Sequence, residues 1–267
     1  MTPELAAAVE NAYREFARYR LRGAIAVCNC NVCVSAEDER ALCTVPLRQM
    51  PSRLLAEYTH SAHGCDDRVA DELRYFLPRY FELIANGDPP TNTGIEMCLG
   101  RLHDAAYRAN WPASEVAAVD TFLAALLRGL LGEAPDIDPT GLPAFGADVV
   151  EDMLCMAAHA GGDIAALLGI WEAARGRAAT LYVANVVSKA DWRKQRLENG
   201  FWTMSTRPHA ESDMRDVLAW LLRSETRERL EDACLAEQDE AAAALLSHAE
   251  GLVAGAIRKG VGDQLRR

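Results

Sequence analysis

The sequence has little positive charge relative to its negative charge. Its 28 lysine and arginine residues are outnumbered by 39 aspartate and glutamate residues, which gives a net charge of −11. Such a surface repels a phosphate backbone, and no basic stripe with interleaved aromatic residues compensates for it. We therefore expect no nucleic-acid partner. A basic or strongly cationic partner is electrostatically easier to attract.

The sequence also lacks a long uninterrupted apolar run. A membrane-spanning helix needs about 20 consecutive apolar residues. The longest candidate runs from Val116 to Leu131 and is interrupted by Asp120, Thr121 and Arg128. The first residues lack the basic segment and following apolar stretch of a signal peptide. The sequence therefore predicts a cytoplasmic protein that does not contact a membrane.

Familiar catalytic motifs are missing as well. The sequence contains no P-loop, no G-x-S-x-G elbow, no H-E-x-x-H and no G-x-G-x-x-G after a strand. Four histidines lie far apart with no shared spacing, namely His103, His159, His209 and His248. A lone histidine is more often a surface or packing residue than a ligand. These absences favour a binding function over an enzymatic one.

Helical periodicity dominates what is present. Apolar residues recur at positions i, i+3 and i+4, as in an amphipathic helix, and no alternating run requires a sheet. The pattern predicts helices over 3–21, 35–44, 51–60, 66–84, 93–102, 112–130, 147–160, 163–174, 177–190, 209–223, 225–236 and 238–258. No consensus repeats at a fixed period. We therefore expect an all-α fold built as an irregular stack of antiparallel helix pairs, either solenoid-like or a globular bundle.

One stretch is rich in proline and glycine. Residues 134–146 contain Pro135, Pro139, Gly141 and Pro143, and they form the longest non-helical segment of the pattern. Domain boundaries often fall in such segments. The sequence thus predicts a helical half over 1–134 and a second helical half over 147–267, or one continuous domain.

Side-chain chemistry is concentrated in the first of these halves. Zinc in structural sites takes four cysteine or histidine ligands, and a Cys-x2-Cys pair supplies two of them from one turn. Cys30 and Cys33 have this spacing. The candidate ligands are Cys28, Cys30, Cys33, Cys43, His60, His63 and Cys65. These residues could form a structural Zn²⁺ site, and the alternative is a cysteine-rich loop whose thiols pack or stay free.

Two other interpretations of this region stay open. A redox role for Cys30 and Cys33 would need a thiol at a helix start beside a βαβ unit, and the sequence does not predict one. A metal-dependent enzyme using the Cys28–Cys65 region would need an open coordination position and a general base. Asp66 and Asp67 have suitable side chains, but acidic residues at a helix start are more often explained by the helix dipole.

The chain also resembles a known group of sequences. The resemblance is carried in chain order by Cys30 to Val34, Pro46-Leu47-Arg48, Tyr58, Arg74 to Ile84 and Trp111-Pro112. Trp220-Leu221-Leu222 and Arg229-Leu230-Glu231-Asp232-Ala233 complete the pattern. These segments are similar to those of a family of uncharacterised bacterial cytosolic helical proteins. The resemblance implies a bacterial cytosolic protein and transfers no catalytic residue.

Together these features favour a helical protein that binds another protein. The acidic balance, the predicted helical stack and the missing catalytic motifs all fit an immunity or adaptor protein. The sequence does not specify its oligomeric state. A metal-dependent enzyme in the Cys28–Cys65 region remains the second hypothesis.

Overall fold

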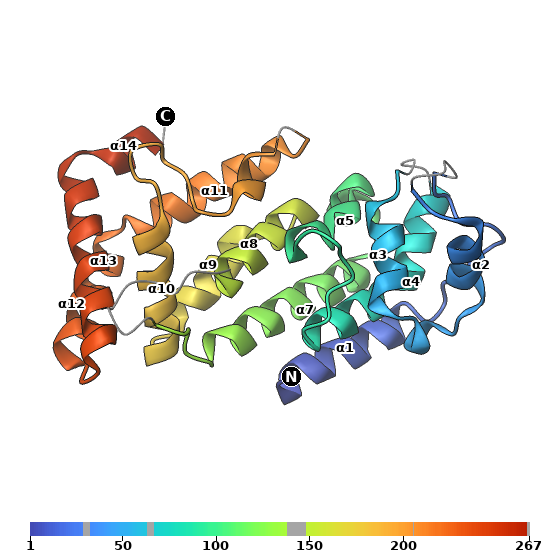
Figure 1. The fold of residues 1–267 in the computed structure, drawn as a ribbon, viewed down its shortest axis with the longest axis horizontal. Coiled ribbons are helices and arrows are strands. Elements are labelled where there is room, and N and C mark those ends of the chain that lie inside the picture. The colour runs from blue at the N-terminus through green and yellow to red at the C-terminus, as the bar shows by residue number, and fades with distance from the viewer. Residues whose placement is uncertain (29–32, 63–66, 138–147, 205, 266–267) are drawn as a thin grey trace. The chain divides into compact units, whose positions relative to one another are not determined.

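The all-α prediction is confirmed by the computed structural model, which describes residues 1–28, 33–62, 67–137, 148–204 and 206–265 (Figure 1). Within these ranges there is no β-strand, and an isolated bridge joins Asp191 to Arg196. The elements are α1 Pro3–Glu15, α2 Ala36–Thr44, η1 Leu47–Gln49, α3 Ser52–His60, α4 Asp67–Ala85, η2 Ile95–Met97, α5 Gly100–Asp104, α6 Tyr107–Asn110, α7 Ala113–Leu131, α8 Val149–Ala160, α9 Ile164–Ala173, α10 Arg177–Lys189, η3 Gly200–Thr203, α11 Pro208–Leu221, α12 Ser224–Ala236, α13 Glu240–Arg258 and α14 Val261–Leu265. Across the same ranges, no helix combines the length and the apolarity that a membrane span requires.

The chain forms two compact units. The first comprises Met1–Leu126 and His159–Gly162, and the second comprises Leu127–Ala158 and Asp163–Arg267. The division thus falls inside α7 and near the end of α8. Most of the proline-rich segment 134–146 lies outside the described residues, so the boundary expected there stays a prediction.

In the first unit, α1 packs on α4. Thr2 caps α1, because its Oγ1 accepts the backbone N–H of Leu5 at 3.2 Å. Leu5, Val9 and Ala12 bury the inner face of α1. The helix ends at Glu15 instead of continuing to residue 21 as the periodicity predicts. Beyond this end, Arg18 and Tyr19 hydrogen-bond to Glu115, and these long-range bonds explain why the local pattern overestimates the helix.

Pro78 lies inside α4, where the sequence predicts a kink or a restart. The structure has one helix from Asp67 to Ala85 with Pro78 in its interior. Arg79 lies next to this proline, and its Nε donates to the carbonyl of Met50 at 2.8 Å, while Nη1 pairs with Glu82 at 2.7 Å. A side chain from the resemblance motif therefore holds the end of η1 against α4.

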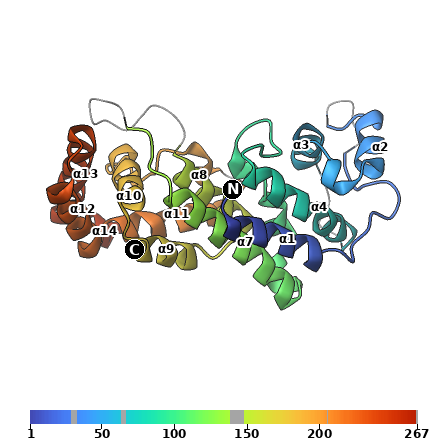
Figure 2. The same cartoon turned by 90° about the horizontal axis from the view of Figure 1, so that it is seen from below.

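The second unit contains a group of long helices. Helices α12 and α13 are joined by a short connection and pack side by side, so they run antiparallel, and α10 packs on α13 (Figures 1 and 2). Nearly every residue of α10 from Ala179 to Val187 is buried. Its core partners include Trp171 of α9, whose ring lies 5.0 Å from that of Trp220. The predicted helices of this half agree with the structure to within a few residues.

Candidate functional site

Four of the seven predicted metal ligands lie in the described part of the chain. Cys28, Cys33 and Cys43 are half-buried, and His60 is exposed at the end of α3. Cys30, His63 and Cys65 lie outside the described residues. Among the residues that are described, no group of three or more histidine, cysteine, aspartate or glutamate side chains is arranged to hold a metal ion. The zinc site therefore stays a prediction.

The backbone on either side of the predicted site is held in place. The N–H of Ala26 donates to both carboxylate oxygens of Glu72, at 3.1 and 2.9 Å, which ties this segment to α4. Two residues later, the N–H of Cys28 donates to the carbonyl of Ala62 at 2.9 Å. Cys28 and Ala62, which precede the two stretches with candidate ligands, are therefore hydrogen-bonded to each other.

A buried arginine anchors the end of α3. Arg101 is 5% exposed, and its Nη2 donates to the carbonyl of Tyr58, to the carbonyl of Ser61 at 3.0 Å and to Ser61 Oγ at 2.9 Å. Its guanidinium lies 4.0 Å from the centroid of the Tyr58 ring, a cation–π distance. Within the described residues, Nε and Nη1 have no hydrogen-bond partner. This buried positive charge lies beside the segment that leads to His63.

His60 and Cys43 have other contacts. Nε2 of His60 accepts the N–H of Asn92 at 3.0 Å, and partial burial lowers the pKa of this histidine. Nδ1 would therefore be the nitrogen offered to a metal unless the bond to Asn92 breaks. Cys43 Sγ lies 3.7 Å from the carbonyl of Gly23. A zinc ion bound through Cys43 or through Nε2 of His60 would replace these contacts.

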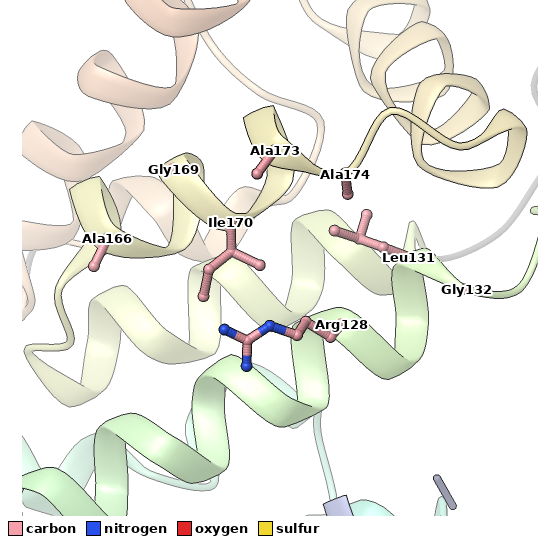
Figure 3. A pocket seen from close by; sticks show the side chains of 8 residues that line it. All are labelled: Arg128, Leu131, Gly132, Ala166, Gly169, Ile170, Ala173 and Ala174. Atoms are coloured by element: carbon pink, nitrogen blue, oxygen red, sulfur yellow. The ribbon is translucent and has the colours of Figure 1, made fainter. Parts of the chain in front are cut away.

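A groove in the second unit was not anticipated from the sequence. It lies between the end of α7 and one side of α9, with a volume of about 530 Å³ (Figure 3). Its lining consists of Arg128, Leu131, Gly132, Ala166, Gly169, Ile170, Ala173 and Ala174. Of these eight described residues, Arg128 alone carries a charge. The groove is thus an open, apolar surface with a cation at its edge.

Helix α9 explains why this surface is apolar. Its inner face buries Ile164, Leu167, Leu168 and Trp171 in the core. Its outer face carries Ala165, Ala166, Gly169 and Ala173, all exposed. A helix that is apolar on all sides is normally buried, whereas a surface helix has a polar outer face. The outer face of α9 therefore has the composition of a contact surface.

Gly169 leaves room in the groove that the fold itself does not use. A Cβ added at this position would meet no atom within 4 Å. Glycine in the middle of a helix costs about 0.5–1 kcal/mol relative to alanine. No close packing in the described structure requires that cost at Gly169.

The second unit also contains two buried carboxyl groups. Asp148 caps α8 by accepting the N–H groups of Val150 and Glu151, both at 3.1 Å. Oε1 of Glu151 accepts the N–H of Asn199 at 2.7 Å and Nε1–H of Trp202 at 3.2 Å, whereas Oε2 has no partner in the described part of the chain. Burial raises the pKa of Glu151 to about 8, and the nearby Asp148 and Asp152 add to the rise. These contacts hold the segment around η3 against α8, so the buried carboxyl groups have a structural role.

Two of these features could not be recognised by motif. The acidic pair Glu151-Asp152 has the usual appearance of a solvated helix start, and burial of Glu151 depends on η3, which is far away in the sequence. The groove left a sequence signal other than a motif. The segment Ile164–Ala173 has one charged residue, Glu172, which is unusually few for a surface helix. Spacing alone does not tell the two faces of α9 apart, because its buried residues and its small exposed residues both recur at helical spacing.

No family model, no curated protein and no solved structure matches this chain. The resemblance to a bacterial cytosolic family therefore stays a prediction. The functional argument depends on the residues described above.

Proposed function

We propose that this chain is a helical protein-binding protein, of adaptor or immunity type, that acts in the bacterial cytoplasm. The observation that carries the proposal is the uncharged outer face of α9, where Ala166, Gly169 and Ala173 are exposed beside a groove of about 530 Å³. Exposed apolar patches of several hundred Å² mark interaction sites in soluble proteins, and we infer the same role for this smaller face.

The form of the groove favours a protein over a small molecule. Small-molecule sites are concave enough to enclose most of the ligand surface and contain several converging polar groups. The α7–α9 groove is open, and Arg128 is the one charged group among the described residues of its lining. Helices that bind partners usually present such an apolar strip with charges at the edge.

The test uses two glycines in equivalent settings. Gly169 of α9 and Gly251 of α13 are both exposed helical positions where an added Cβ meets nothing within 4 Å. Wild type, Gly169→Gln and Gly251→Gln are immobilised and exposed to a bacterial lysate, and the retained proteins are quantified by mass spectrometry. We expect a protein that wild type and Gly251→Gln retain equally and that Gly169→Gln loses.

The outcome is decisive because both variants should fold. Glutamine is a good helix former, and both substitutions replace a helix-interior glycine. Equal retention of every protein by all three forms would exclude the groove as the docking surface. Circular dichroism and thermal unfolding of each form confirm that a loss of binding is not a loss of fold.

A structural zinc at the N-terminal cysteines is the second part of the proposal. It is supported by the hydrogen bond between Cys28 and Ala62, the described residues that precede the two stretches with candidate ligands. Arg101 adds support, because a buried guanidinium without a carboxylate partner in the described residues favours an anion nearby. A zinc site with three thiolates carries net negative charge.

Metal content tests this part independently of the groove. Protein purified without an affinity metal is measured by mass spectrometry, as wild type and as a Cys30→Ser/Cys33→Ser variant. We expect about one zinc per chain in wild type, as in other structural sites, and its loss in the variant. Absence of zinc from wild type would reject both the structural site and the alternative of a metal-dependent enzyme.

A further inference from the structure

The segment around η3 is held on α8 by a buried carboxyl group. We propose that residues 198–204, called the η3 segment below, open away from α8 in a step linked to the release of one proton from Glu151. This step is a pH-dependent conformational device within the second unit. Three observations support it: the hydrogen bonds of Glu151, the charges around it and the local bonding of the η3 segment.

The hydrogen bonds of Glu151 suit a neutral carboxyl group. Glu151 is 1% exposed, and the N–H of Asn199 at 2.7 Å and Nε1–H of Trp202 at 3.2 Å both bond to its Oε1. Oε2 is buried and has no hydrogen-bond partner in the described part of the chain. A carboxylate shares its charge between two oxygens. Ionisation therefore leaves a charged oxygen buried without a donor, which is costly.

The charged groups next to Glu151 on its own helix are acidic. Asp148 precedes it by three residues and Asp152 follows it directly. Burial and these two acids raise the pKa of Glu151 to about 8. From the η3 segment, Glu151 contacts Asn199 and Trp202, which are neutral. The surroundings of Glu151 thus oppose a negative charge from both sides.

The titratable groups of the neighbouring helices act on other parts of α8. Lys189 of α10 lowers the pKa of Asp148, and its Nζ pairs with Glu198 of the η3 segment at 3.4 Å. Tyr182 of α10 also faces Asp148. His209 of α11 contacts a carbonyl group near the other end of α8. Among the described residues, none of these groups offers Glu151 a positive charge.

Local bonding allows the η3 segment to open by itself. Asn199 supplies two of its bonds to α8, from the backbone N–H to Glu151 and from Nδ2 to Asp152 at 2.7 Å. Within the segment, the N–H of Trp202 bonds to the carbonyl of Asn199 at 3.4 Å. Segments outside the regular helices open locally at a lower free energy than the whole fold. Because Trp202 is fully buried, the open form is a minor one.

Opening brings Glu151 into contact with water, where its pKa falls towards the ordinary value of 4.5. Between this value and about 8, the closed form holds a proton that the open form releases. The ratio of open to closed form therefore rises by up to about tenfold for each pH unit in this range. Below the range both forms are protonated, and the segment is most firmly closed. The open form exposes Trp202, so exposure of this aromatic side chain increases with pH.

Amide hydrogen exchange measures this opening directly. The N–H of Asn199 donates to Glu151 itself, so its exchange requires that bond to break. The amide of Val183, in the buried middle of α10, reports the opening of a larger part of the unit. NMR follows both amides from pH 5.5 to pH 7.5. Each exchange rate is divided by the rate of an unfolded chain at the same pH, which gives a protection factor.

Two variants isolate the contribution of Glu151. Glu151→Gln keeps an acceptor oxygen for Asn199 but has no proton to release. Asp213→Asn removes another carboxyl group of the same unit, whose pKa is raised to about 7 by burial and by Asp216 and Asp163. In wild type and in Asp213→Asn, the protection factor of Asn199 should fall about fiftyfold from pH 5.5 to pH 7.5. In Glu151→Gln it should change by less than about threefold.

Each outcome supports or overturns the proposal. A protection factor of Asn199 that does not depend on pH in wild type, or that falls equally in Glu151→Gln, would overturn it. Equal protection of Asn199 and Val183 in wild type would overturn it as well, because the segment would then open only when the unit unfolds. This comparison and the wild-type pH profile also decide the matter if Glu151→Gln does not fold, which circular dichroism shows.

Discussion

Two buried glutamates, one in each unit, show how differently the same side chain can be accommodated. Glu115 of the first unit is fully buried, and Glu151 of the second is 1% exposed. Both lie in the first turn of a helix, α7 and α8 respectively. Their partners differ in charge: Glu115 is paired with arginines, and Glu151 accepts hydrogen bonds from neutral groups only.

Glu115 is surrounded by cations. Arg18 pairs with its Oε1, Tyr19 donates to the same oxygen at 2.5 Å, and Nε of Arg74 donates to Oε2 at 3.0 Å. Arg74 also lies 4.4 Å from the ring centroid of Trp111, which shields the pair from water. Three separate segments therefore meet at one carboxylate.

Glu151 has no cation among its described partners. It accepts one backbone N–H and one indole N–H, from Asn199 and Trp202. Since burial penalises the charged form, its pKa rises to about 8 and the carboxyl is protonated at neutral pH. Glu115 is thus held by two arginines and a tyrosine, whereas Glu151, without a cation among its described partners, is stabilised in its neutral form.

Replacing each glutamate by glutamine should have unequal effects. Glu115→Gln leaves the largely buried guanidinium of Arg74 without its main partner, although Asp71 still pairs with it at 3.1 Å. Breaking a buried pair costs about 3–5 kcal/mol, and the remaining partner favours the lower end, so we expect about 3 kcal/mol. Glu151→Gln replaces a neutral group by another and should cost about 1 kcal/mol or less.

Urea unfolding at pH 7, followed by circular dichroism, measures both free energies of unfolding. Equal losses for the two variants would contradict the view that Glu115 is held by ion pairs and Glu151 by neutral hydrogen-bond donors. The double variant serves as a further control, since sites without shared partners should have additive effects.

The comparison also predicts how stability depends on pH. The pKa of Glu151 is about 8 in the folded protein, above its ordinary value of 4.5. Between these values the unfolded chain releases a proton that the folded chain retains, so the free energy of unfolding falls as pH rises. One such group contributes a slope of at most about 1.4 kcal/mol per pH unit. Asp213, whose pKa is raised to about 7, acts in the same direction.

Glu151→Gln isolates the contribution of this one group. Between pH 5 and pH 8, the free energy of unfolding should change less with pH in the variant than in wild type, because glutamine does not titrate. Identical pH profiles would show that Glu151 is already ionised at neutral pH in the folded state.

The smallest expected effects concern one glycine from each unit. Gly161 of the first unit has φ +74°, and an added Cβ would lie 3.3 Å from Nδ1 of His103. Gly161→Ala should therefore cost about 1–2 kcal/mol. Gly169→Ala in the second unit meets no neighbour and should stabilise the protein by about 0.5–1 kcal/mol.

Thermal unfolding of the two alanine variants gives the sign of each change. A stabilised Gly169→Ala would mean that this glycine is absent from the internal packing of α9. A destabilised Gly169→Ala would assign it to the fold and weaken the case for a contact surface.

Much of the helical architecture could be predicted from local pattern. Ser35 caps α2 as expected, since its Oγ accepts the N–H of Asp38 at 3.0 Å. Local rules work here because caps and apolar spacing act within one or two turns. They fail from Thr93 to Leu102, where one helix was predicted and the structure has the short elements η2 and α5, followed by α6 after Ala106 at φ 45°.

The candidate sites, too, could be predicted from the sequence only in part. Residue type and spacing identify the cysteines and histidines as candidate ligands without any structure, because metal chemistry depends on the side chains themselves. Which buried carboxyl is charged, and which exposed face lacks a partner, depends on residues far apart in sequence, such as Arg18 with Glu115 and Trp202 with Glu151. Local periodicity therefore decides where the helices form, whereas tertiary packing decides which of their polar groups are paired and which apolar surface, the outer face of α9, remains exposed.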